Sequence, residues 1–211
     1  MYKFIFVPIL AVMLATSAAQ AATISGWTHP DYVKADINTS YSPADSSLLL
    51  TVKNTSPADS ATLRGLLFTA PDVTLTLREV SYYSQSVSTP IQVTKNWNID
   101  SAEGTNLNAE PMKYYDGLNT VLYTGNNFQG GNPKTGLDVG WTATFLFDVD
   151  GEMEAPLNQF IARFQSIDYA GMTASDSDFA HSVPTPIPGA VWLFTFGLAG
   201  IALLRQRIIT S

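Results

Sequence analysis

The sequence predicts an all-β protein whose body is a single antiparallel β-sandwich, with a jelly-roll-like topology as one form of it. The first observation is a two-residue alternation of apolar and polar side chains. In VTLTLRE, for example, Val73, Leu75 and Leu77 alternate with polar neighbours. The second is that turn-forming segments such as NTSPADS, TAPD and GNNFQGGNPKTG separate these runs. The third is that residues 22–182 show no sustained apolar period of 3.6, so the helical pattern is missing there.

The N-terminal segment, residues 1–21, is typical of a secretory signal peptide. Lys3 precedes an apolar stretch over residues 4–15, and small residues follow it. An A-x-A pattern then predicts cleavage by signal peptidase at a site formed by Ala19, Ala21 and Ala22. An uncleaved membrane anchor is the alternative, although the apolar stretch is short for a membrane span. We therefore expect an exported chain that begins at Ala22.

Residues 22–173 are predicted to form the β-domain, which is large enough for one hydrophobic core. Its strongest strand lies in GWTATFLFDVDG, and the inward-facing set is Trp141, Ala143, Phe145, Phe147 and Val149. In QFIARFQS, the inward-facing set is Phe160, Ala162 and Phe164, and the outward-facing set is Ile161, Arg163 and Gln165. Shorter strands are expected near residues 32–37, 48–52, 63–68, 91–93 and 121–123. Because the chain has no cysteine, core packing rather than disulfides must stabilise this domain.

Three segments follow the β-domain. Residues 174–186 (ASDSDFAHSVPTP) are polar and contain two prolines, so they are predicted to be a linker with a proline motif. Residues 187–204 are 18 uncharged, mostly apolar residues. As a helix they would be about 27 Å long, close to the ~30 Å hydrocarbon core of a bilayer, which predicts a transmembrane helix. A buried core helix is the alternative, but it would usually show a polar face. Residues 205–211 carry two arginines and are predicted to be a basic cytoplasmic tail.

The C-terminal tail combines prolines, an aromatic run and arginines. It contains VPTP at residues 183–186, PIPGAVWLF at 186–194, GLAG at 197–200 and two arginines near its end. In these features it resembles the PEP-CTERM sorting signals, especially their VPLPA-type variant. The residues assigned to the sorting motif are Val183, Pro184, Pro186, Ile187, Pro188, Trp192, Arg205 and Arg207. Thr185, Ile187 and Gly189 depart from the family patterns, which leaves open the peptide bond that is cut.

The resemblance implies a partner and a location. The partner is an exosortase, a membrane transpeptidase-like enzyme of exopolysaccharide-producing Gram-negative bacteria. The precursor would be tethered transiently to the inner membrane by its C-terminal helix and would face the periplasm, and the mature protein would reach the cell surface or the extracellular matrix. The body is more weakly similar to uncharacterised PEP-CTERM bodies, in LLLTVKNTSPADSATLRGLLF, GWTATFLFDVDG and FIARFQSIDYAGMTASDSD. Because those bodies carry no established activity, the resemblance implies a location rather than a reaction.

The exported body is strongly acidic. All 18 acidic residues lie within residues 22–182, whereas three of the 11 basic residues, Lys3, Arg205 and Arg207, lie outside. The body therefore holds 8 basic and 18 acidic residues, a net charge of −10. Such a charge repels nucleic acids and anionic lipid surfaces, so we expect no nucleic-acid partner.

Motifs for catalysis and metal binding are sparse. The two histidines are His29, in GWTHPDY, and His181, in the predicted linker; both lie outside the predicted strands, and no G-x-S-x-G motif occurs. We therefore expect a non-catalytic protein without a cofactor. One candidate calcium site lies in FDVDGEME, where Asp148, Asp150 and Glu152 flank a glycine turn. A solvated turn without a ligand is the alternative.

Taken together, these features predict a non-catalytic cell-surface or extracellular-matrix protein, and three alternatives stay open. One is a resident membrane protein with a single span, which would keep its C-terminal tail; the other two concern the function of the body. The first is a carbohydrate-binding-module-like protein that binds exopolysaccharide through exposed aromatic side chains, for which KYYDG and NNFQGG are the candidate segments. The second is a secreted glycan-active enzyme, because glycoside hydrolysis needs only two well-placed carboxylates among the 18 acidic residues.

Overall fold

Eleven β-strands and two short 3₁₀-helices make up the computed structural model, which describes residues 19–70, 72–103, 105–107, 110–125, 127–128, 135–153, 157–169 and 176–182. The strands are β1 (Ala19–Gly26), β2 (Lys34–Ser42), β3 (Ser47–Asn54), β4 (Ser60–Thr69), β5 (Thr74–Ser84), β6 (Val87–Gln92), β7 (Trp97–Ser101), β8 (Thr120–Thr124), β9 (Thr142–Asp150), β10 (Asn158–Asp168) and β11 (Asp176–Ser182). The 3₁₀-helices are η1 (Thr94–Asn96) and η2 (Met112–Tyr114). The predicted all-β class is confirmed.

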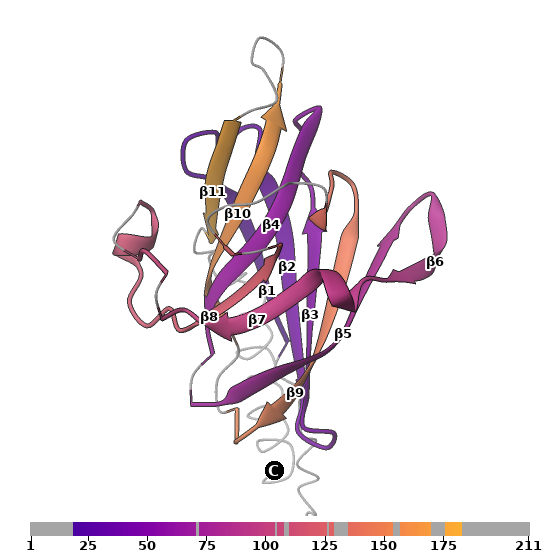
Figure 1. Ribbon diagram of the computed structural model, residues 1–211, viewed down its shortest axis with the longest axis vertical. Coiled ribbons are helices and arrows are strands. Elements are labelled where there is room, and N and C mark those ends of the chain that lie inside the picture. Colours follow the sequence, from indigo (N-terminus) through magenta and orange to yellow (C-terminus); the bar gives the residue numbers. More distant parts are fainter. Residues whose placement is uncertain are drawn as a thin grey trace, which may run out of the picture.

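All the strands belong to one continuous antiparallel sheet, in the order β6-β5-β9-β3-β2-β1-β11-β10-β4-β8-β7. The predicted β-sandwich would have two separate sheets, so the single sheet corrects that part of the prediction. Because the twist between neighbouring strands accumulates, a sheet of this width curls. The curl brings β5 and β7 together from opposite ends of the strand order (Figure 1), and the Trp97 Nε1–H donates to the Tyr82 hydroxyl at 2.6 Å.

The main core lies inside the curl and contains the side chains that the alternation predicted. Phe145 and Phe147 of β9 are fully buried, and Trp141 packs against the same cluster from its edge. The Trp97 ring meets Phe145 edge to face, with the ring centroids 4.8 Å apart. The inward set of β10, which is Phe160, Ala162 and Phe164, belongs to the same core.

A second, smaller cluster covers part of the outer face of the sheet. Ile161 was expected to point outward to solvent, but it is fully buried beside Leu67 and Phe128. The reason is that residues of the long connection between β7 and β8, including Met112 and Leu118, pack over this face. Strand β4 is therefore buried on both faces, which explains why its sequence, SATLRGLLFT, does not alternate.

The predicted linker, residues 174–186, needs the main correction. Its residues 176–182 form β11, which lies between β1 and β10 in the middle of the sheet. Ala180 pairs with Ala162 of β10 and with Gly26 of β1. The described domain thus extends to Ser182, beyond the predicted boundary at residue 173. A polar strand was mistaken for a linker because its partners, rather than its own side chains, supply the apolar environment.

The predicted terminal segments lie mostly outside the described residues. These are most of the signal peptide, the sorting motif from Val183 onward, the apolar run 187–204 and the tail 205–211. In the part of the chain that the structure describes, no helix is long and apolar enough to cross a membrane. The three residues of the predicted signal peptidase site belong to β1, where Ala19 pairs with Ser40, Ala21 with Asn38 and Ala22 with Ile37.

Candidate functional site

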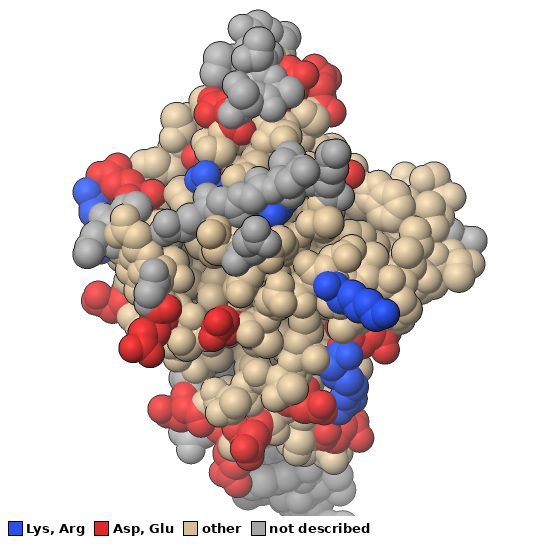
Figure 2. Space-filling view, viewed as in Figure 1, with Lys and Arg blue, Asp and Glu red and all other residues tan. Residues whose placement is uncertain are grey.

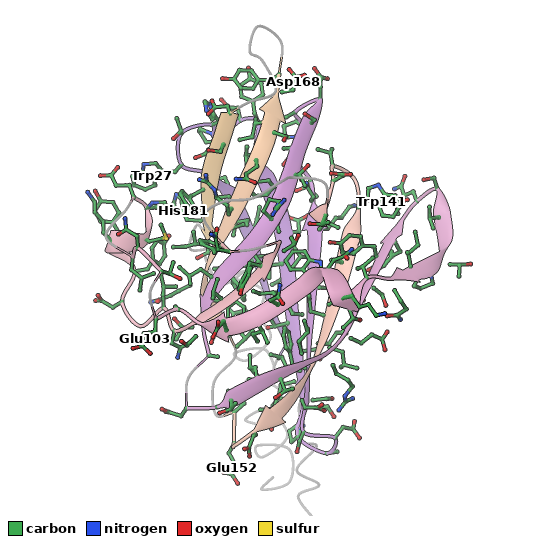
Figure 3. The ribbon with its side chains drawn as sticks, in the orientation of Figure 1. Trp27, Glu103, Trp141, Glu152, Asp168 and His181 are labelled. Atoms are coloured by element: carbon green, nitrogen blue, oxygen red, sulfur yellow. The ribbon has the colours of Figure 1, made fainter. Side chains whose placement is uncertain are left out.

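Aromatic and charged side chains from three distant parts of the chain meet on one side of the molecule. We call this group the aromatic site; its members are Trp27, Glu110, Lys113, Tyr114, Tyr115 and His181. Trp27 follows β1, the central four residues lie in and around η2, and His181 belongs to β11. Figure 3 labels Trp27 and His181, which lie close together on the same side of the molecule.

A buried carboxylate holds the loop that carries Trp27. Asp178, only 3% exposed, accepts hydrogen bonds from three backbone N–H groups: His29 at 2.8 Å, Phe179 at 2.8 Å and Thr28 at 3.1 Å. The Trp27 N–H also donates to the Phe179 carbonyl at 2.7 Å. Gly26 is required before this loop, since a Cβ there would lie 2.5 Å from the Asp178 carboxylate. These contacts fix the position of Trp27.

The rings of Trp27 and Tyr114 stack on each other at the surface. Their centroids are 5.5 Å apart and their planes differ by 26°. The His181 ring meets Trp27 edge-on at 5.3 Å. Trp27 is 41% exposed and Tyr114 is 60% exposed, so apolar ring surface faces water. Such a surface can bind the apolar face of a ligand at low conformational cost, because the stacking already fixes the rings.

Tyr115 connects η2 to the end of β11. Its hydroxyl lies 2.8 Å from His181 Nδ1 and 3.3 Å from the Ser182 carbonyl oxygen. Burial raises the pKa of Tyr115, so the hydroxyl keeps its proton at neutral pH. This contact ties the aromatic site to the last residues of the described domain.

An ion pair forms the polar part of the site. Lys113 Nζ lies 2.5 Å from Glu110 Oε1, and the Tyr114 hydroxyl donates to the same oxygen at 3.2 Å. The ammonium also lies 5.0 Å from the centre of the Tyr114 ring, within range of a cation–π interaction. The hydrogen bond from Lys113 is the main cause of a lowered pKa at Glu110, and the same bond raises the pKa of Lys113. Both groups are therefore charged at neutral pH.

The sequence predicts only part of this site. KYYDG, one of the two candidate segments, supplies Lys113, Tyr114 and Tyr115. Phe128, from the other segment NNFQGG, is buried in the outer cluster and lies 6.0 Å from the Phe179 ring. The contribution of Trp27 was missed, because it lies more than 80 residues from Tyr114 and no local pattern links the two. His181 was missed because its strand was taken for a linker.

His29, the other histidine, supports the connection between β1 and β2, which also carries Trp27. Its Nε2 lies 2.9 Å from Asp176, and its Nδ1 lies 3.4 Å from the Tyr169 hydroxyl. Tyr32 stacks on Tyr169 with the centroids 4.0 Å apart and the planes 14° apart. Since both ring nitrogens have a partner, His29 is placed to hold the loop against the ends of β10 and β11.

The three candidate calcium-binding residues have different surroundings. Asp148 of β9 pairs with Arg78 of the neighbouring strand β5. Asp150 and Glu152 are exposed at the end of β9. Among the described residues, no group of three His, Cys, Asp or Glu side chains is placed to hold a metal ion.

Comparisons of the chain with protein-family models, with curated proteins and with solved structures found no match.

Proposed function

We propose that the chain is an exported, non-catalytic surface or matrix protein that binds carbohydrate at the aromatic site. The observation that carries the binding role is the exposed, prestacked pair of Trp27 and Tyr114 beside the Glu110–Lys113 ion pair. Export and location rest on the N-terminal signal pattern and on the resemblance of residues 183–207 to exosortase sorting signals. In this proposal the host is a Gram-negative bacterium that makes exopolysaccharide, and its exopolysaccharide is the ligand.

Carbohydrate suits the chemistry of this site better than other ligand classes. A sugar ring has an apolar C–H face that packs on an aromatic ring and a rim of hydroxyl groups that need hydrogen-bond partners. The site offers both, since the rings lie next to a carboxylate, an ammonium and two phenolic hydroxyls. A nucleic acid would also stack on aromatic rings, but the net charge of −10 on the body opposes its phosphates.

The test is calorimetric titration of the full chain, purified in a mild detergent, with the exopolysaccharide of the host. We expect weak binding that Trp27→Ala and Tyr114→Ala each reduce at least about tenfold, as removal of a central aromatic contact typically does. Tyr32→Ala is the matched control, because Tyr32 is an exposed, stacked tyrosine outside the aromatic site. Binding that neither site variant weakens would contradict the proposal.

A parallel assay for released reducing sugars separates binding from hydrolysis. We expect no sustained release of sugar. Sustained release that disappears when one carboxylate is replaced would instead establish the glycan-active enzyme, in which a pair of carboxyl groups does the chemistry.

A further inference from the structure

The aromatic site already binds a cation, and that cation belongs to the chain itself. The ammonium of Lys113 lies against the Glu110 carboxylate and over the Tyr114 ring, 5.0 Å from its centre. A carboxylate together with an aromatic face is a general arrangement for binding an ammonium group. Lys113 is 40% exposed and sits on a long side chain, so it can leave Glu110 without any change in the backbone.

The surroundings of the site favour cations and oppose anions. Segment 100–116 carries four acidic residues, Asp100, Glu103, Glu110 and Asp116, against the single basic residue Lys113. Acidic side chains also outnumber basic ones over the face shown in Figure 2. Because the screening length at physiological salt is about 8 Å, Glu110, which lies in the site, supplies the main attraction for an ammonium group and repels carboxylates and sulfates.

We propose that the aromatic site selects glycans with free amino groups, and that the sugar ammonium replaces Lys113 on Glu110 and over the Tyr114 ring. This inference rests on the proposed function and names its ligand class. The exchange is noncovalent: Glu110 releases one ammonium and accepts another, so the carboxylate keeps a cationic partner. An N-acetylated sugar cannot make this exchange because its amide is neutral. A uronic acid would place a second carboxylate against Glu110.

The ionisation of Glu110 is compatible with this exchange. Its pKa is lowered, first by the hydrogen bond from Lys113 and further by Tyr114 and Trp27. The carboxylate therefore stays charged in mildly acidic solution, where a sugar amine carries its proton.

The experiment compares three oligosaccharides of equal length on the full chain, by calorimetry at about pH 6. The probes are a glucosamine oligomer, an N-acetylglucosamine oligomer and a glucuronic acid oligomer. We expect the glucosamine oligomer to bind about tenfold more tightly than the N-acetylated one, as one charge-assisted hydrogen bond typically allows. Binding of the glucuronic acid oligomer should be the weakest.

Three variants test which residue causes the preference for the glucosamine oligomer. Glu110→Gln should abolish the advantage of the glucosamine oligomer and leave the weak binding that depends on stacking. Lys113→Gln should increase affinity for the glucosamine oligomer severalfold, because the internal competitor is gone. Asp116→Asn is the matched control: it removes one exposed negative charge from the same segment but lies outside the site.

The outcomes separate the inference from the proposed function. Equal affinity for the glucosamine and N-acetylglucosamine oligomers would overturn the inference and leave carbohydrate binding intact. Binding of none of the three, together with none to the host polysaccharide, would overturn both. If Asp116→Asn lowers the preference as much as Glu110→Gln does, the attraction comes from overall charge, and the assigned exchange at Glu110 is wrong.

Discussion

The carboxylate of Asp178 organises the loop between β1 and β2. It accepts hydrogen bonds from three backbone N–H groups in a partly buried environment, and these hydrogen bonds are charge-assisted. The same loop carries Trp27 at one end and His29 further along. The side chain of Asp178, on β11, thus determines where the rings of Trp27 and His29 lie.

Replacing Asp178 by Ala should therefore destabilise the protein and weaken carbohydrate binding together. We expect a loss of about 2–4 kcal/mol in the free energy of unfolding, because each donor left without a partner costs ~1–3 kcal/mol. Urea denaturation measures this loss. Asp31→Ala is the control, since Asp31 is exposed in the same loop. Similar losses in the two variants would contradict the assigned role of Asp178.

Phe145 is the residue on which core stability depends most clearly. It is fully buried and packs edge to face against Trp97, so it joins β9 to the far end of the curled sheet. Phe145→Ala should cost about 3–5 kcal/mol, a large part of the typical 5–15 kcal/mol total, and no disulfide compensates in a chain without cysteine. Leu49→Ala on the neighbouring strand β3 should cost under about 1 kcal/mol, because Leu49 is 40% exposed. Chemical denaturation of both variants tests this difference.

At the scale of elements, β11 is the strand whose role is most easily tested. It is hydrogen-bonded on both sides, to β1 and to β10, so its removal would leave each of these inner strands unpaired on one side and divide the sheet. A chain that ends at residue 175 should not fold cooperatively, whereas one that ends at Ser182 should. Thermal unfolding followed by circular dichroism distinguishes the two. Cooperative unfolding of the shorter chain would show that β11 is a removable linker after all.

Sequence patterns predicted the strands that are buried on one face only. Strand β9 has a buried inner face with Phe145 and Phe147, so the period-two rule located both the strand and its core residues. The rule located a strand near residues 63–68, inside β4, but did not predict that this strand is buried on both faces, and it missed β11. Strand β4 is buried on both faces because residues of the β7–β8 connection cover its outer side. Strand β11 has polar inner positions because Asp178 bonds the loop rather than packing in the core.

The aromatic site was predictable only in part, because it is a tertiary feature. Tyr114 and Tyr115 are adjacent in a polar segment, which marks them as candidate surface aromatics. Trp27 and His181 reach them only because β1 and β11 are neighbours in the sheet. That pairing depends on the order of eleven strands, which no local pattern encodes.

At the scale of the whole molecule, both ends of the domain lie on adjacent central strands. Ile24 of β1 pairs with Ser182 of β11, so the chain enters and leaves the sheet side by side (Figure 1). Cleavage before Ala22 would still leave four β1 residues paired with β2, from Ala22 to Ser25. Among the described residues, the pairs of β11 lie at or before Ser182. Loss of both terminal segments thus leaves β1 paired with β2 over four residues and leaves the described pairs of β11 in place.

We therefore predict that the extracellular protein is trimmed at both ends and remains folded. Intact-mass analysis of the protein from cells with an exosortase should find Ala22 as the first residue and a C-terminus within residues 186–189, after the prolines of the sorting motif. The trimmed protein should still unfold cooperatively in urea, because four of the seven residue pairs between β1 and β2 remain, together with the described pairs of β11. The same measurement in cells without the enzyme is the control, and there residues 192–205 should be retained. Retention of residues 192–205 in both strains would favour a resident membrane protein held by its C-terminal helix, and would refute sorting by an exosortase.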